Sequence, residues 1–276
     1  MEGIKMTRFT VVVLSLITIS FILAGVSHTK IDKKDIVGIW LFDEGKGDAA
    51  EDASGNGNLG EINGAKWDNG KFGKALSFNG KDNYVKIDYS STLDITTPFT
   101  VGAWVKCQDS TGLNYQWLYT NFDDDAARYS GFSLSLEGDT AKDLKATLVI
   151  YNGGNAWRPR GTTNIVDDQW HHTVGVWDGS LMKIYVDGKL ENTFAQETPP
   201  LEAQTEQWGC IGCVGDYVDA GTEEYPFLGI IDEFSIFNVA LTENDIQNIM
   251  TKGLKGITAV SPKGKLATTW GDIKQQ

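Results

Sequence analysis

The sequence predicts an all-β fold: an antiparallel two-sheet sandwich with one short helix near the C-terminus. Apolar and polar residues alternate with a period of two over many short segments, and turn signals separate these segments at close intervals. The chain of 276 residues also contains 31 Gly and only 6 Pro. This composition favours an antiparallel sandwich over a fold of alternating strands and helices.

The expected strands are short segments, each bounded by turn residues. The clearest of them cover residues 75–80, 84–88, 99–105, 131–136, 146–151, 172–177 and 183–186. Three Asx-Gly pairs are hairpin signals, because glycine adopts a positive φ at little cost. These pairs are Asn79-Gly80, Asp178-Gly179 and Asp187-Gly188.

One helix is expected after the last strand. Thr242 is a suitable N-cap, and Glu243 and Asp245 favour the positive end of the helix dipole. Three apolar residues share one face of this helix: Ile246, Ile249 and Met250. Gly253 is expected to end it.

The N-terminus has the pattern of an export signal. Lys5 and Arg8 precede an apolar run over residues 11–26, and small residues surround position 27. We therefore expect residues 1–27 to be a cleaved signal peptide, so that the protein is extracytoplasmic, either secreted or at the cell surface. The alternative is a retained membrane anchor, although the run is shorter than the roughly 20 residues of a spanning helix. One domain is then expected over residues 35–250, followed by a basic C-terminal tail over residues 251–276.

The chain is acidic, with 24 Lys and Arg against 37 Asp and Glu and a formal net charge of −13. Both ends are basic, so the acidity is concentrated in the body of the protein. Such a surface repels phosphate backbones, which argues against nucleic-acid binding. The 9 Trp, 9 Tyr and 12 Phe can bury a sizeable core, which argues against disorder.

Three cysteines lie in the body of the chain: Cys107, Cys210 and Cys213. Export permits a disulfide, and an odd count leaves one thiol over. Cys210 and Cys213 can close on each other, or one of them can pair with Cys107. Zinc is not expected, because a structural site needs four ligands and few imidazoles are present. We therefore expect one structural disulfide and one buried thiol.

Seven segments between residues 36 and 250 carry a family resemblance. They are residues 38–45, 52–58, 72–85, 99–105, 170–179, 184–190 and 229–242. In this order they resemble the LamG-like jellyroll, the concanavalin A-like fold shared by laminin G domains, pentraxins and many bacterial modules. The resemblance implies the fold but not one function, because the fold serves lectins, adhesion modules and glycosidases alike.

A short loop rich in Asx and Gly has the pattern of a calcium site. Asp52, Ser54 and Asn56 place oxygen side chains at alternating positions. Gly57 allows a sharp bend, and Asn58 follows it. Alternating oxygens suit a hard cation, but the loop lacks the flanking helices of an EF-hand and its twelfth-position Glu. The alternative is a solvated turn, since Asx and Gly favour turns without any metal.

The resemblance supplies the remaining ligands of this site. It implies that the first strand and the last long strand lie side by side, which places Asp43 near Asp232. The predicted calcium site therefore consists of Asp43, Asp52, Asn58 and Asp232 together with backbone carbonyls. Its expected role is structural.

Aromatic side chains are the expected ligand contacts, because sugar rings stack on the faces of Trp and Tyr. Four tryptophans lie within strand patterns and are expected in the core: Trp40, Trp104, Trp170 and Trp177. Other aromatic residues lie nearer loops or strand ends: Trp117, Tyr119, Trp157, Trp208, Tyr217 and Tyr225. From this set and its neighbours, the predicted ligand-binding residues are Trp117, Trp157, Arg158 and Tyr217. The alternative for Arg158 is an ion pair with a neighbouring carboxylate.

The sequence shows no catalytic pattern. A glycosidase needs two carboxylates in an open cleft, and Asp232 and Glu233 would point to opposite faces of a regular strand. We therefore predict a non-catalytic binding module, stabilised by calcium, that recognises carbohydrate or another extracellular glycoconjugate. The alternatives are a glycoside hydrolase on the same fold, or a structural or adhesion protein that binds protein partners.

Overall fold

The computed structural model describes residues 31–96, 98–108, 112–123, 130–195, 201, 207–213 and 225–258. The chain divides into two compact units, Met1–Lys30 and Ile31–Gln276, and every described residue belongs to the second. The predicted signal peptide and residues 259–276 of the predicted tail lie outside the described residues. Within the described ranges, no helix is long and apolar enough to cross a membrane.

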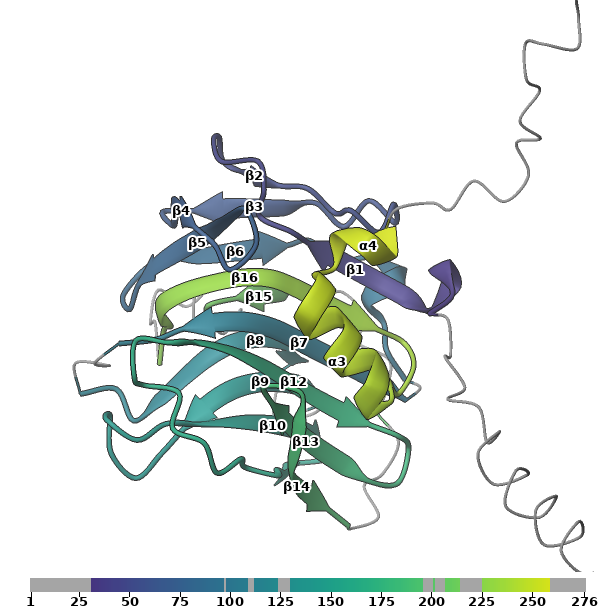
Figure 1. The fold of residues 1–276 in the computed structure, drawn as a ribbon. Helices are drawn as coiled ribbons and strands as arrows, with labels where there is room; N and C mark the ends of the chain where they lie inside the picture. The colour runs from purple at the N-terminus through teal and green to yellow at the C-terminus, as the bar shows by residue number, and fades with distance from the viewer. Residues whose placement is uncertain are drawn as a thin grey trace, which may run out of the picture. The chain divides into compact units, whose positions relative to one another are not determined.

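Two antiparallel sheets pack face to face, as the sequence predicts (Figure 1). In sheet A the strand order is β14 (Lys189–Phe194), β13 (Met182–Val186), β12 (Trp170–Trp177), β7 (Phe99–Lys106), β16 (Leu228–Phe237), β5 (Lys74–Asn79) and β4 (Lys66–Asn69). Strand β1 (Ile36–Trp40) pairs with the C-terminal half of β16, where Trp40 lies opposite Phe234. The first strand and the last long strand are therefore neighbours, as the resemblance implies.

Sheet B contains the remaining strands. Its order is β11 (Asn155–Trp157), β10 (Lys145–Asn152), β9 (Ser130–Glu137), β8 (Tyr115–Asp123), β15 (Gly209–Ile211), β6 (Tyr84–Ile87), β3 (Gly60–Asn63) and β2 (Ala49–Ala50). Each of the seven clearest strands in the sequence is confirmed within these two sheets.

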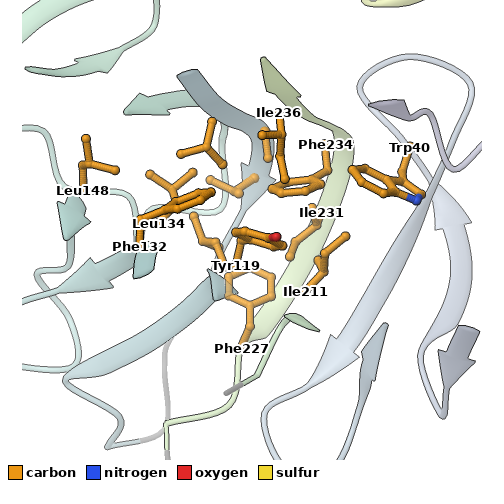
Figure 2. Close-up of a cluster of buried hydrophobic side chains, with 14 of the residues drawn as sticks. Trp40, Tyr119, Phe132, Leu134, Leu148, Ile211, Phe227, Ile231, Phe234 and Ile236 are labelled. Atoms are coloured by element: carbon orange, nitrogen blue, oxygen red, sulfur yellow. The ribbon is translucent and has the colours of Figure 1, made fainter. Parts of the chain in front are cut away.

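The core lies between the two sheets and consists of the inward-facing side chains of alternating strand positions (Figure 2). Tyr119 packs at its centre, with ring centroids 4.9 Å from Phe234 and 5.6 Å from Phe132. The prediction that Tyr119 lies nearer a loop is therefore wrong. A β-bulge between Trp117 and Tyr119 shifts the alternation of β8, so that Trp117 faces outward and Tyr119 inward.

The tryptophans expected in the core follow the strand pattern closely. Trp40, Trp104 and Trp177 are buried, and Trp170 at the start of β12 is half-buried. Trp104 reaches this state on the outer face of sheet A, meaning the face turned away from sheet B, where the ring of Phe72 lies 6.3 Å from it. Burial in this fold therefore does not require a place between the sheets.

The predicted helix is confirmed as α3 (Glu243–Lys252). The Thr242 side chain accepts a hydrogen bond from the Asp245 amide, and the Asp245 carboxylate accepts one from the Thr242 amide. This capping box starts the helix, and Gly253 at φ 72° ends it. The apolar face of α3 packs on the outer face of sheet A (Figure 1).

The ordered chain continues past α3. A second short helix, α4, covers Lys255–Thr258, and Leu254 between the two helices is fully buried. Two short 3-10 helices, η1 (Lys33–Asp35) and η2 (Ser91–Leu93), complete the described elements. Residues 251–258 of the predicted tail thus pack with the sandwich.

Candidate functional site

The predicted calcium loop is closed by the carboxylate of Asp52. Its Oδ1 accepts hydrogen bonds from the amides of Ile39 (3.1 Å) and Ser54 (2.9 Å), and its Oδ2 accepts one from the amide of Asn58 (3.0 Å). These bonds fold the loop on itself and tie it to β1. These three hydrogen bonds give Asp52 a structural task in the loop.

Asn58 is buried and has a hydrogen-bond partner for each of its polar groups. Its Nδ2 donates to the carbonyl of Val37 (2.9 Å), and its Oδ1 accepts from the hydroxyl of Thr92 (2.9 Å). Its backbone carbonyl accepts from the indole nitrogen of Trp40 (2.9 Å). Asp52 and Asn58 thus form one group, which anchors the loop to the first strand.

Asp43 and Asp232 form a second group, around the turn that joins β4 to β5. Oδ2 of Asp232 accepts a hydrogen bond from the amide of Phe72 (2.9 Å), and Oδ1 of Asp43 accepts one from the amide of Lys74 (3.0 Å). Gly73, at φ 62°, lies so close to Asp43 that a Cβ atom there would overlap the carboxylate. The structure therefore brings two of the four predicted ligands to the same turn.

The electrostatics of this second group are unusual. Asp232 is 0% exposed, and its Oδ1 has no hydrogen-bond partner among the described residues. Burial raises the pKa of Asp232 to about 7, and the adjacent Glu233 carboxylate adds to the effect. Burial also raises the pKa of Glu233 to about 7, with Asp43 adding to it. We call Asp43, Asp232 and Glu233 the acidic group; it favours a proton or a cation.

Glu233 occupies a β-bulge in β16. The pairing with β7 shifts register between Asp232 and Ser235, and Glu233 has φ 48°. Its Oε2 accepts a hydrogen bond from the amide of Leu254 (2.6 Å), just beyond α3. The expectation that Asp232 and Glu233 alternate between the faces of a regular strand is therefore wrong, because the strand is irregular at this point.

The acidic group alone does not make a metal centre. Among the described residues, no three His, Cys, Asp or Glu side chains are arranged to hold a metal ion together. A cation bound at the unpaired oxygen of Asp232 would need backbone carbonyls as further ligands, as calcium commonly uses. The residues present fit such a site, because a buried and unpaired carboxylate oxygen is a suitable ligand for a hard cation.

A second candidate site lies on the outer face of sheet B. The rings of Tyr115 and Trp117 on β8 meet edge to face at 4.5 Å, and the ring of Tyr225 lies 5.4 Å from Tyr115. Beside them the Arg158 guanidinium lies 3.5 Å from the Glu137 carboxylate. We call these five residues the sheet B cluster.

The members of the sheet B cluster differ in exposure. Tyr225 is 42% exposed and the Arg158 side chain 45%, whereas Trp117 is only 6% exposed. Tyr115 is half-buried, and burial raises the pKa of its phenol. Tyr225, Arg158 and part of Tyr115 thus offer the accessible surface, and Trp117 supports them from beneath.

The predicted ligand-binding residues are distributed around this cluster. Trp117 and Arg158 belong to it, and Arg158 also forms the ion pair given above as its alternative. Trp157 is half-buried and packs against the core between the sheets, and Tyr217 lies outside the described residues.

Sequence reasoning missed Tyr115 and Glu137, because it searched loops rather than strands for ligand contacts. A signal was present. Tyr115 and Trp117 are two residues apart on β8, so their side chains lie on the same face of the strand. Glu137 stands opposite Tyr115 on β9. The period of two therefore placed all three on one face of sheet B.

The prediction of one disulfide is confirmed, and of the two pairings left open the structure has Cys210 with Cys213. Cys107 is a buried free thiol. Burial raises the pKa of Cys107 to about 12, so this thiol stays protonated and unreactive. The prediction of one bridge and one buried thiol thus holds.

Comparison with known proteins finds similar sequences and similar folds. Pappalysin-1 of Mus musculus is 24% identical over an alignment 223 residues long, which covers 73% of this chain and 12% of that relative. Domain 4 of AbnA, an extracellular GH43 arabinanase from Geobacillus stearothermophilus solved with arabinotriose, has a TM-score of 0.60 at 20% identity, covering 78% of this chain and 98% of that one. The ligand binding domain of botulinum neurotoxin serotype D, solved with N-acetylneuraminic acid, has a TM-score of 0.59 at 13% identity, covering 79% and 51%.

At these identities the solved structures show a shared fold, and the chain spans only a small part of its curated relative. A family model gives the stronger assignment. It matches residues 79–247, more than half of the chain, and covers strands of both sheets together with the first half of α3. This chain belongs to the concanavalin A-like lectin/glucanases superfamily.

Proposed function

We propose that this protein is an exported, non-catalytic module that binds carbohydrate at the sheet B cluster. One observation carries the proposal: on the outer face of sheet B, away from α3, the rings of Tyr225 and Tyr115 lie 5.4 Å apart, and Tyr115 stands next to the Arg158–Glu137 ion pair. Arabinotriose and N-acetylneuraminic acid in two structural neighbours support this class of ligand.

The chemistry of the cluster suits a sugar. The rings of Tyr115 and Tyr225 can stack on the apolar face of a pyranose or furanose. Arg158 supplies fixed N–H donors, and Glu137 supplies an acceptor whose other oxygen is 3.4 Å from the hydroxyl of Ser135. Because the ion pair has no net charge and the chain is acidic, neutral sugars are favoured over acidic ones.

The carboxylates argue for binding without hydrolysis. Asp232 and Glu233 are both buried, beneath the β4–β5 turn and beside Leu254. A glycosidase instead needs its two carboxylates in an open cleft that admits the scissile bond.

A glycan array with the full protein tests the proposal. We expect retention of neutral glycans, and about a tenfold loss of affinity for Tyr225→Ala and for Arg158→Ala. Arg160→Ala is the matched control, because the Arg160 side chain is also 45% exposed and also pairs with an acidic residue, Asp139. Equal losses for Arg158→Ala and Arg160→Ala, or no glycan retained at all, would refute the proposal.

We further propose that calcium binds at the acidic group in a structural role. Asp43 and Asp232 would be ligands there together with backbone carbonyls, and the ion would supply positive charge to carboxylates held close together. Asp52 and Asn58, the other two residues of the predicted site, support the same end of the sandwich by fixing the loop to β1. A change in the melting temperature on chelation is the direct test.

A further inference from the structure

We infer that the Cys210–Cys213 disulfide holds Tyr225 in its ligand-facing position, so that reduction of this bridge weakens binding at the sheet B cluster. The part of the inference that concerns ligand binding rests on the proposed function. Its structural part, the dependence of Tyr225 on the bridge, can be tested without any ligand.

Tyr225 has a backbone conformation that is costly for its residue type. Its φ is 57°, in the left-handed region that favours glycine. Such strain persists only where the surrounding structure over-determines it. The Tyr225 side chain is 42% exposed and is therefore little constrained by packing, although its ring lies 5.4 Å from that of half-buried Tyr115. The backbone must therefore be held by other contacts.

The contacts that hold it lead to the disulfide. The carbonyl of Tyr225 accepts a hydrogen bond from the Trp117 amide (3.1 Å). Two residues later, the amide of Phe227 donates to the carbonyl of Gly212 (3.0 Å), inside the Cys210–Cys213 turn. The amide of Gly212 in turn donates to the carbonyl of Leu118 (3.1 Å). Tyr225 and the bridged turn are thus fixed to adjacent residues of β8.

The bridge closes the turn on which this path depends. Gly212 lies within this turn and has φ 87°. The disulfide between Cys210 and Cys213 restricts the conformation that the turn can adopt. On one side, Cys210 pairs within sheet B with Thr120. On the other, the hydroxyl of the same Thr120 donates to the carbonyl of Cys213 (2.9 Å). Both ends of the turn therefore meet β8 at one residue.

The disulfide is buried at the short strand β15. Its three residues are the only strand between β6 and β8 in the described part of sheet B. Trp208 and Tyr84 pack around the bridge, with ring centroids 6.4 Å apart, and Cys210 is fully buried. The bridge is therefore shielded, and a reductant reaches it only when this part of sheet B opens locally.

The redox step is ordinary thiol–disulfide exchange with an external dithiol. One thiolate of the dithiol attacks a bridge sulfur, forming a mixed disulfide and releasing a cysteine thiolate that takes up a proton. The second thiol of the reagent then displaces the other cysteine. Two electrons pass to the protein, which gains two thiols, and the reagent leaves as a cyclic disulfide.

Amide hydrogen exchange read by mass spectrometry tests the structural part. The full protein is measured oxidised, reduced with dithiothreitol, and as the Cys210→Ser/Cys213→Ser double variant. We expect protection of the Trp117 and Phe227 amides to fall about tenfold on reduction, while the amides of β12 and β13 in sheet A keep theirs. Cys107→Ala is the control that leaves the bridge intact, and its Trp117 amide should match the wild type.

The outcomes separate the two proposals. Unchanged protection at Trp117 and Phe227 after reduction overturns the inference. An equal fall in both sheets also overturns it, because the bridge would then act on global stability alone. Where protection falls locally, retention of neutral glycans on the array should fall about tenfold with it. A local fall in a protein that retains no glycan even when oxidised supports the role of the bridge and rejects the proposed function.

Discussion

Replacing Asp232 by Asn is expected to stabilise the calcium-free protein at pH 8 and to remove its response to calcium. Asp232 is 0% exposed, one of its carboxylate oxygens is unpaired, and its pKa is raised from 3.8 to about 7 by burial. Asparagine has the same shape and keeps an oxygen for the Phe72 amide, but it carries no charge to bury. The substitution thus isolates the cost of the buried charge.

The sign follows from proton binding. Between the unfolded pKa of 3.8 and the folded pKa of about 7, the folded protein holds a proton on Asp232 that the unfolded chain releases. The free energy of unfolding therefore falls as the pH rises through this window. A difference of about three pKa units corresponds to about 4 kcal/mol, fully developed at pH 8. Under the calcium proposal, bound ion would oppose this loss, and a concentration of about 100 times its Kd would add about 2.7 kcal/mol.

The assay is urea unfolding followed by tryptophan fluorescence at pH 5 and pH 8, with calcium or with EDTA. Wild type and Asp232→Asn are compared at each pH, so that titrating groups not coupled to Asp232 cancel in the difference, and the change includes the response of the adjacent Glu233. Asp139→Asn is the control, because Asp139 is 94% exposed. In EDTA the wild type should lose stability relative to Asp232→Asn between pH 5 and pH 8. If the two proteins keep a constant difference, and calcium stabilises neither, the reasoning about the acidic group fails.

Three other substitutions test the fold. Thr242→Ala should cost about 1 kcal/mol of unfolding free energy in urea, because it removes the cap on the Asp245 amide, whereas Thr251→Ala at the exposed end of α3 should cost less. Burial lowers the pKa of His172 from 6.5 to about 4, so its contribution to stability is lost as the pH falls through that window, and His172→Gln should flatten this part of the pH profile of urea midpoints. Phe234→Ala should lower the unfolding free energy by about 3–5 kcal/mol, measured in urea at pH 7, through the cavity left in the core.

The strands and α3 could be predicted because their signals are local. A period of two identifies a strand wherever one face is buried, and Thr242 followed by Asp245 identifies a helix start. The same signals place the tryptophans of regular strands, such as Trp40 and Trp177, in buried positions. In these segments local preference and tertiary packing agree.

The errors lie at bulges, where local and tertiary signals disagree. Tyr119 follows a bulge in β8, and Glu233 occupies one in β16. An extra residue shifts every later side chain to the other face, and whether it is present depends on the partner strand. No pattern within β8 or β16 alone reveals this shift.

The candidate sites could be predicted in part, for a related reason. An Asx- and Gly-rich loop has the same pattern whether Asp52 accepts backbone amides or binds an ion. Asp43 and Asp232 are far apart in sequence, and the family resemblance alone placed them together. One oxygen of Asp232 lacks a partner among the described residues because the β4–β5 turn donates a hydrogen bond to the other oxygen only. This geometry depends on tertiary packing, so no local sequence pattern reveals it.

The two outer faces of the sandwich differ in what covers them. On sheet A the chain covers its own surface: α3 packs over its strands, and Lys71 lies 4.4 Å from the centre of the Trp104 ring. Asp232 and Glu233 are buried beneath that cover, where they cannot meet a large ligand, whereas Asp43 at its edge is exposed. On sheet B, Tyr225 and Arg158 stay exposed although each is held by specific contacts. Side chains that are fixed and exposed at once lose little entropy when they bind, and this favours the sheet B cluster as the place of recognition.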